Sequence, residues 1–270
     1  MTAEPGARRL PTDPAPVDVT GLADRLRRAV AERTAIDPLS TDEPGLDLAA
    51  GYAVQRVLRA QAGPLVGWKL GVTSRAKQVQ VGIDTPVYGF LAAAHRHPAG
   101  RPLDVSALIQ PRGEPEIAFV LGQDLAGPRV TAADVLAATA GVAVGIEVLD
   151  SRYRDYRFTI ADVVADNTSA GRFVVGAAVP PAGIDLRLVG VVFERNGEMV
   201  ATAAGAAVLG HPAAAVAWLV RALAGDGTGL RAGEIVLSGG ITAAVPVEPG
   251  DVLCATVDRL GTLDLTITGC

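Results

Sequence analysis

The stretch PRGEPEIAFVL, residues 111–121, ends in a continuous apolar run but begins with two glutamates one residue apart. A short apolar run of this kind is typical of a buried β-strand. Residues i and i+2 of a strand point to the same face, so Glu114 and Glu116 would lie about 7 Å apart on one face. Like charges at that spacing repel each other. The pair is therefore either a solvated strand end or two oxygen ligands for a divalent cation, and the stretch alone leaves both open.

A third glutamate, Glu147, lies in GVAVGIEVLD, residues 141–150, which is another strand-like apolar run. With Glu114 and Glu116 it would complete a site for Mg²⁺ or Mn²⁺, because carboxylates and waters satisfy the octahedral shell of these ions. Such a site forms only if the two strands meet, which the sequence does not establish.

Short apolar runs punctuated by Gly and Pro continue after residue 100 and indicate a core of many antiparallel strands. The Asn-Gly pair in ERNGEMV, residues 194–200, predicts a β-hairpin. Helical patterns are found in residues 21–35, 47–63 and 131–141 and in the segment that begins at Pro212. The expected fold class is therefore α+β, with N-terminal and peripheral helices around a β-rich core.

A chain of 270 residues with 49% hydrophobic content can bury a large core, and no second domain boundary is visible. The Pro-rich residues 1–20 are expected to be a disordered lead-in, and residues 21–270 to form a single catalytic domain. Within that domain, residues 21–98 are expected to be a helical N-terminal part that includes the strand of Lys69. Residues 99–270 are expected to form the β-rich core.

The charge and cysteine content exclude several classes of partner. A net charge of −5 argues against nucleic acid and acidic membranes and favours a small ligand. The two cysteines, Cys254 and Cys270, are too few for a disulfide framework, which fits a reducing cytoplasm. The apolar residues 205–225 are interrupted by His211, Pro212 and Arg221, so they predict a buried helix and not a membrane span.

Lysine is rare in this chain, since Lys69 and Lys77 are the two lysines among 24 basic residues. Lys69 lies in PLVGWKLGVTS, residues 64–74, which reads as a buried strand. A buried ammonium needs a partner, and lysine, unlike arginine, can shift its pKa enough to exchange protons near neutrality. Lys69 is thus either one half of a structural salt bridge or an acid-base group. Lys77, in a polar stretch, is expected to be a solvated helix residue.

A polar cluster follows in YRFTIADVVADNTSAGRF, residues 156–173, where Asp162, Asp166 and Asn167 precede Ser169 and Arg172. These side chains are typical of a binding segment, but also of a loop with Asx turns. The sequence leaves both interpretations open.

Taken together, these segments resemble the hydratase and decarboxylase group of the fumarylacetoacetate hydrolase superfamily. The resemblance covers roughly residues 22–267, through the blocks GWKLGVTS, GIDTPVYGFL, QPRGEPEIAFVLGQDLAGP, GIEVLDSRYRDYRF, VVADNTSAGRF, RNGEMVATAAGAAVLGHPAAAVAWL and SGGITAAVPVEPGD. It implies a mixed β-roll core with helices packed outside. It also implies a divalent metal at Glu114, Glu116 and Glu147, a catalytic lysine at Lys69 and an active-site aspartate at Asp84.

Two activities share these motifs in that group: hydration of 2-oxopent-4-enoate and decarboxylation of 2-oxo-3-hexenedioate in aromatic meta-cleavage catabolism. The blocks IDTPVYGFL, DSRYRDYRF, VVADNTSAGRF and SGGITAAVPV are more similar to those of the decarboxylase, and Gly171 before Arg172 is a small departure. The resemblance also implies a homo-oligomer and association with a homologous hydratase. The expected substrate-binding residues are Tyr88, Asp166, Asn167, Arg172 and Ser238.

Arg172 is the first candidate for the distal carboxylate of a dicarboxylate substrate, and Tyr88 is the second. The competing interpretation of Arg172 is an ion pair with Asp162 or Asp166. Intact Lys69 and the three glutamates count against a non-catalytic metal-binding subunit. Cleavage of acylpyruvates would require a water-activating His-Glu pair, and the sequence offers no matching pair.

Overall fold

The computed structural model describes residues 17–74, 78, 83 and 85–269. Its largest element is a curled seven-stranded sheet with the strand order β2-β1-β11-β4-β6-β7 and with β12 paired to β4. All pairings in this sheet are antiparallel except that of β1 with β11. Its strands are β1 (Leu65–Gly71), β2 (Val87–Ala92), β4 (Pro111–Leu121), β6 (Thr139–Asp150), β7 (Ala170–Val175), β11 (Ile235–Leu237) and β12 (Val245–Pro246).

A second, five-stranded sheet has the order β3-β14-β13-β8-β9. It consists of β3 (Leu103–Asp104), β8 (Gly190–Arg195), β9 (Glu198–Ala204), β13 (Val252–Val257) and β14 (Gly261–Thr268). The predicted hairpin joins β8 to β9, and Asn196 and Gly197 both have positive φ angles at its turn. A small separate ladder pairs β5 (Leu125–Ala126) with β10 (Gly229–Leu230).

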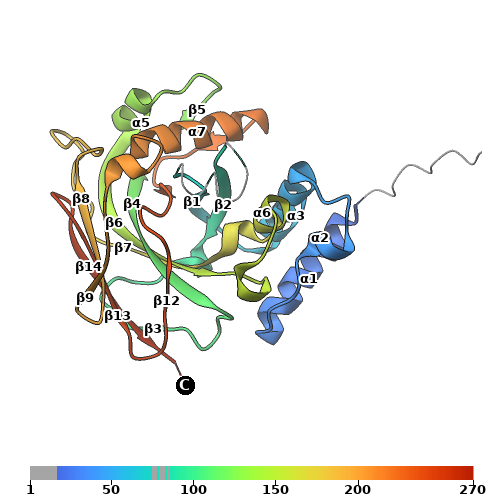
Figure 1. Cartoon of the computed structure of the whole chain (residues 1–270). Helices are drawn as coiled ribbons and strands as arrows, with labels where there is room; N and C mark the ends of the chain where they lie inside the picture. Colours follow the sequence, from blue (N-terminus) through green and yellow to red (C-terminus); the bar gives the residue numbers. More distant parts are fainter. Residues whose placement is uncertain (1–16, 75–77, 79–82, 84, 270) are drawn as a thin grey trace, which may run out of the picture.

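Helices pack at two places around the sheets (Figure 1). Near one end of the large sheet lie α1 (Val19–Glu32), α2 (Leu39–Asp42), α3 (Leu48–Gln61) and α6 (Ile160–Ala165). Across the top in Figure 1 lie α5 (Ala132–Ala138) and α7 (Pro212–Gly225). Helix α5 begins at Thr131 with the capping box to Asp134 that its sequence predicts. The expected α+β architecture, a curled mixed sheet with peripheral helices, is confirmed.

Helix α7 accounts for the most apolar stretch of the chain. The window Gly205–Gly225 is long and apolar enough to cross a membrane, but half of it is buried inside the protein. The α7 side chains that pack in the core include Val216, Leu219, Val220 and Leu223. His211 is the N-cap, and its Nδ1 accepts from the Ala213 N–H at 3.0 Å.

The structure decides against one interpretation that the sequence left open. The segment before Asn167 is not a loop, because Thr159 and Asp162 form a capping box that starts α6. The expected strand of Lys69 is β1, and both β1 and β2 of the N-terminal part belong to the same sheet as β4 and β6. They add one edge to the sheet that carries the glutamates, which brings Lys69 near them.

Candidate active site

The register of β4 against β6 brings the three glutamates together. Glu114 lies directly opposite Glu147, and Glu116 lies two residues further along β4 on the same face. All three side chains are buried, and one carboxylate oxygen from each lies within 4.8 Å of the others. The two strands therefore pair side by side, which the sequence had not established.

The link between β11 and β12 closes over this cluster. The Gly239 N–H donates to Glu116 Oε2 at 2.6 Å, and Gly239 has a φ of +104° that favours glycine. A Cβ atom at Gly240 would lie 2.1 Å from Glu114 Oε2, so a side chain there would displace the carboxylate. Ser238, on the same link, is fully buried and its Oγ has no hydrogen-bond partner within the described residues.

Lys69 contacts the cluster from β1. Its Nζ lies 2.9 Å from Glu147 Oε1 and donates to the Thr168 carbonyl oxygen at 2.7 Å. Its side chain is only 2% exposed. The salt bridge considered from the sequence is thus present, and its carboxylate belongs to the glutamate cluster. The salt bridge therefore does not exclude a role for Lys69 as an acid-base group, because its carboxylate partner is itself part of the candidate metal site.

Three buried carboxylates lie together in the cluster, and two of their oxygens, Glu116 Oε1 and Glu147 Oε2, accept no hydrogen bond from the described residues. Burial raises the pKa of Glu116 well above its usual range, and the charges of Glu147 and Glu114 raise it further. Burial also raises the pKa of Glu147, although Lys69 opposes that rise. A divalent cation with a preference for oxygen ligands fits this donor set and this charge.

The stabilisation that Mg²⁺ gives should increase with pH. Because the folded-state pKa of Glu116 is raised, the metal-free folded protein binds more protons than the unfolded chain, and it loses stability as Glu116 ionises. A cation competes with these protons. We expect the difference in Tm between samples with Mg²⁺ and with chelator to grow from about pH 5.5 to about pH 8. Measuring both samples at each pH cancels other titrating groups, and a pH-independent difference would contradict the assignment.

A cavity of about 740 Å³ opens onto the cluster. Lys69, Glu114, Thr168 and Gly240 line its inner end. Its remaining wall is contributed mainly by residues 70–72 and by the segment 155–163, which includes Tyr156, Arg157 and Phe158, and it also bears Arg112 of β4. The guanidinium of Arg112 lies over the Tyr156 ring, 4.0 Å from its centroid.

Sequence reasoning did not select Arg112 or Arg157. A signal for Arg112 was nevertheless available, because it precedes Glu114 by two residues in the same strand and must share its face. No equivalent signal marked Arg157, which follows a one-turn helix, residues Arg154–Tyr156, whose position depends on tertiary packing.

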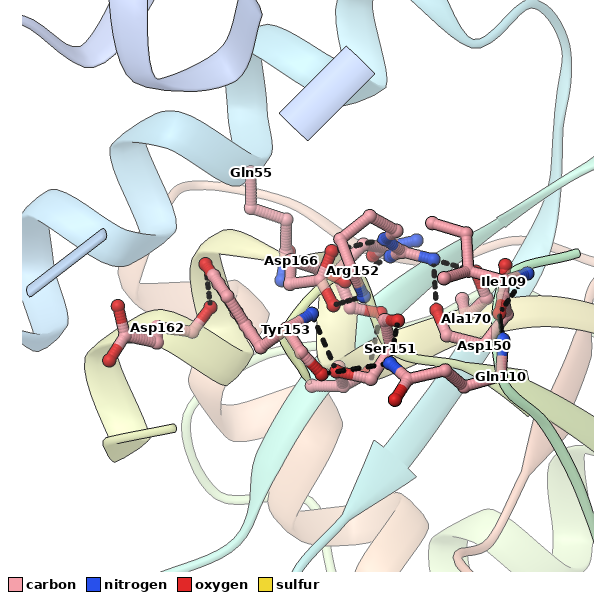
Figure 2. A network of polar contacts seen from close by, with 12 residues as sticks. Gln55, Ile109, Gln110, Asp150, Ser151, Arg152, Tyr153, Asp162, Asp166 and Ala170 are labelled. Carbon is pink, nitrogen blue, oxygen red and sulfur yellow. Dashed lines mark hydrogen bonds and ion pairs between the residues drawn. The ribbon is translucent and has the colours of Figure 1, made fainter. Parts of the chain in front are cut away.

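Several predicted substrate residues lie elsewhere. Tyr88 lines a different cavity, where its hydroxyl donates to Asp226 Oδ2 at 3.3 Å. Asp166, Asn167 and Arg172 line another cavity of about 410 Å³, behind the segment that carries Thr168. Asp166 is paired with Arg152 (Figure 2), and Asn167 hydrogen-bonds the backbone of Phe90, so both serve the fold where they stand.

Arg172 has neither of the ion pairs considered from the sequence. Its Nη1 donates to the Gly171 carbonyl oxygen at 2.9 Å, while Asp162 caps α6 and also accepts from Ser40. The structure therefore separates Arg172 from the glutamate cluster. Asp84 and Lys77 lie outside the described residues.

Comparison with known proteins places this site in a family. Residues 69–268 match the model of the fumarylacetoacetate (FAA) hydrolase C-terminal family. The chain is 45% identical over 238 residues to a 4-oxalocrotonate decarboxylase of Pseudomonas sp. (strain CF600), covering 86% of this chain and 90% of the relative. It is 40% identical over 255 residues to a 2-keto-4-pentenoate hydratase of Burkholderia vietnamiensis (strain G4 / LMG 22486), covering 93% and 97%.

A solved structure agrees with these sequence relatives. The 4-oxalocrotonate decarboxylase from Pseudomonas putida G7, complexed with magnesium and adipate, superposes with a TM-score of 0.88 at 42% identity. The match covers 92% of this chain and 97% of that one. The chain that carries the buried glutamate cluster and Lys69 therefore belongs to the fumarylacetoacetate hydrolase C-terminal family.

Proposed function

We propose that this chain is a divalent-metal-dependent lyase that decarboxylates 2-oxo-3-hexenedioate to 2-hydroxypenta-2,4-dienoate. The observation that carries the proposal is the contact of Lys69 with Glu147 at the end of a cavity whose wall also bears Arg112. The names of the relatives support it, since both decarboxylases and hydratases occur among them.

Glu114, Glu116 and Glu147 would hold the cation, Mg²⁺ or Mn²⁺, because their buried carboxylate oxygens converge. When bound, the cation would supply Lewis-acid stabilisation of negative charge on an oxygen of a 2-oxo acid. The Gly239 N–H keeps Glu116 oriented, and Gly240 leaves the space that the Glu114 carboxylate occupies.

Lys69 would handle the charge and the proton of the reaction. The bond to the distal carboxyl carbon breaks, CO₂ leaves, and the electron pair moves through the conjugated chain to the ketone oxygen as a dienolate. The Lys69 ammonium, held by Glu147 and the Thr168 carbonyl, stabilises that charge and can donate the proton that gives the dienol. The predicted partner of Lys69 in this step is Asp84.

Arg112 is the residue that we propose to meet the distal carboxylate. It lies about 7 Å from Glu114 along the same face of β4, two strand rises away. Five C–C bonds of about 1.5 Å, in an extended zigzag, separate the carboxyl carbons of a six-carbon dicarboxylate by roughly 6 Å. A substrate with one end at the glutamates would therefore place its other carboxylate near the Arg112 guanidinium. The stack on Tyr156 fixes that guanidinium in position.

Replacing Arg112 with methionine should raise KM for 2-oxo-3-hexenedioate by at least about tenfold, because a charge-assisted contact is worth about 1.5–3 kcal/mol. Mg²⁺ affinity should be retained. Steady-state kinetics and a metal titration on the same sample measure both quantities. A larger rise in KM for Arg157→Met would transfer the role to Arg157, and one for Arg172→Met would return it to the residue that the sequence favoured.

The function itself is tested by product identification. Purified protein with Mg²⁺ should release one CO₂ per 2-oxo-3-hexenedioate consumed and yield 2-hydroxypenta-2,4-dienoate. Rapid hydration of 2-hydroxypenta-2,4-dienoate without any CO₂ release from the dicarboxylate would instead identify the chain as the hydratase.

We further propose that the protein works in the cytoplasm as a homo-oligomer and can associate with a homologous hydratase. Exposed apolar side chains along β8, β9 and β13 support a contact surface there, namely Leu188, Val192, Met199, Val200 and Val252. Sedimentation velocity would measure the mass of the assembly, and a monomer at micromolar concentration would contradict it.

A further inference from the structure

The carbonyl group that holds Lys69 comes from an unusual turn. Asn167, Thr168 and Ser169 are three successive non-glycine residues with left-handed φ angles of 50°, 51° and 58°. Side chains disfavour this backbone conformation, so three in a row persist only where the surrounding structure enforces them. The turn connects α6 to β7, and its Thr168 carbonyl oxygen accepts from Lys69 Nζ at 2.7 Å.

Arg152 fastens both ends of this turn (Figure 2). Its Nη2 donates to the Asp166 carbonyl oxygen at 2.5 Å, and its Nη1 donates to the Ala170 carbonyl oxygen at 2.9 Å. Its Nε donates to the Asp166 carboxylate, which also accepts from the Arg152 backbone N–H at 3.1 Å. A planar guanidinium can reach these acceptors at once, whereas an ammonium offers no such fork.

Neighbouring contacts keep Arg152 and the turn in register. Asp150 Oδ1 accepts from the N–H groups of Ile109 and Gln110, both at 2.8 Å, which anchors the end of β6 just before Arg152. The Asn167 side chain donates to the Phe90 carbonyl oxygen and accepts from its N–H, which fixes the turn against β2. Arg152 and Asp166 are both buried, and neither lines the cavity that holds Lys69.

We propose that Arg152, with Asp166, is a positioning residue for catalysis, acting through the Thr168 carbonyl on Lys69. The inference rests on the proposed role of Lys69. Among the described residues the ammonium has two acceptors, and one of them, Glu147, belongs to the cluster that would hold the cation. The Thr168 carbonyl is thus the acceptor that sets where Nζ points, and Arg152 sets the place of that carbonyl.

The kinetic test uses Arg152→Gln and Asp166→Asn. A misplacement of a reacting group by about 1 Å can cost about 10²-fold in rate. We therefore expect kcat to fall by at least about tenfold in both variants, while KM and the Mg²⁺ dissociation constant stay within about threefold. A lower kcat together with a higher KM and a weaker Mg²⁺ affinity would indicate general disruption and overturn the proposal. An unchanged kcat would overturn it as well.

A second readout does not depend on activity. Because Lys69 and Lys77 are the only lysines in the sequence, protein labelled with ¹³C at the lysine ε-carbon gives two ε-methylene NMR signals. Lys69→Ala assigns them by removing one. In both variants the Lys69 signal should shift or broaden, and the Lys77 signal should stay. If Lys69 keeps its wild-type signal in a variant, the proposal fails. If wild-type protein turns over no substrate, the proposed function fails, and the NMR result still decides whether Arg152 positions Lys69.

The matched control is another arginine–aspartate pair. Arg195 ion-pairs with Asp251 at 2.9 Å in the five-stranded sheet, remote from the glutamate cluster. Arg195→Gln should leave kcat and the Lys69 signal unchanged. Should Arg152→Gln fail to fold, Asp166→Asn alone carries the test, since it replaces the carboxylate that accepts from the Arg152 Nε and backbone N–H and so loosens the guanidinium that holds the turn. Loss of kcat and of the Lys69 signal in the control would show that loss of an arginine–aspartate pair elsewhere in the fold has the same effect, which would also overturn the proposal.

Discussion

Lys69→Ala is expected to lower kcat by about 10²-fold or more, the scale of a positioned acid-base group, while the protein remains folded. The physical reason is the burial of its ammonium between Glu147 and the Thr168 carbonyl, beside the cluster that would hold the metal. Steady-state kinetics with saturating Mg²⁺ measure the loss. Removing the ammonium also takes one positive charge away from the cluster, so Mg²⁺ should bind more tightly to the variant.

Two outcomes would contradict this role. Lys69→Arg should not rescue turnover, because arginine keeps its charge but cannot give up its proton in this pH range. Near-wild-type activity in Lys69→Arg would reduce Lys69 to a fixed positive charge. Weaker Mg²⁺ binding by Lys69→Ala would show that the lysine organises the metal site instead of opposing it electrostatically.

The sequence identifies the three glutamates of the cluster as candidate metal ligands, but not their arrangement in space. The spacing of Glu114 and Glu116 assigns them to one strand face, and Glu147 interrupts an apolar run where an unpaired charge is costly. Their meeting depends on the register of β4 against β6, and a slip of one residue would point Glu147 to the opposite face. Local sequence does not encode that register, which is why the sequence left two interpretations of the pair open.

Arg172 illustrates where sequence proximity misleads. It follows the polar segment 162–169 closely, but the residues on both sides of Thr168 line a different cavity from the one that Thr168 lines. Thr168 faces Lys69, while Asp166, Asn167 and Arg172 line the space behind the turn. These side chains line different cavities because three successive residues of the turn, 167–169, have left-handed backbone angles. Asparagine tolerates that conformation, but threonine strongly disfavours it, so no propensity argument would place Thr168 there.

The sequence also could not predict that β1 belongs to the large sheet. A helical N-terminal part with one strand suggests a separate layer, yet β1 pairs in parallel with β11, far along the chain. Parallel pairing with a distant strand is a tertiary choice without a local turn signal. That pairing brings Lys69 to Glu147, so the candidate site depends on the least local contact of the sheet.

Glu116→Gln should have opposite effects on metal binding and on the stability of the metal-free protein. Glutamine keeps the size of the side chain and an oxygen that can accept from the Gly239 N–H, but it removes one of three buried charges. Because ionisation of Glu116 is unfavourable in the metal-free fold, the variant should melt higher in chelator at pH 8. A gain of about 1 kcal/mol corresponds to roughly 2–4 °C for a chain of this size.

In the presence of Mg²⁺ the wild type should melt at a higher temperature than Glu116→Gln. Substitution of a residue that only supports a metal ligand lowers metal affinity by about 10–100-fold. Loss of the charge of a ligand itself should therefore weaken Mg²⁺ binding by at least about 10²-fold. Turnover at low metal concentration should then be abolished. Isothermal titration and thermal melts with and without Mg²⁺ measure both effects on one preparation. The exposed Glu198→Gln removes the same charge from the surface hairpin and should change neither quantity. If Glu116→Gln melts higher in chelator yet binds Mg²⁺ as tightly as the wild type, the buried carboxylates repel one another without serving a cation, and the metal assignment fails while the electrostatic one stands.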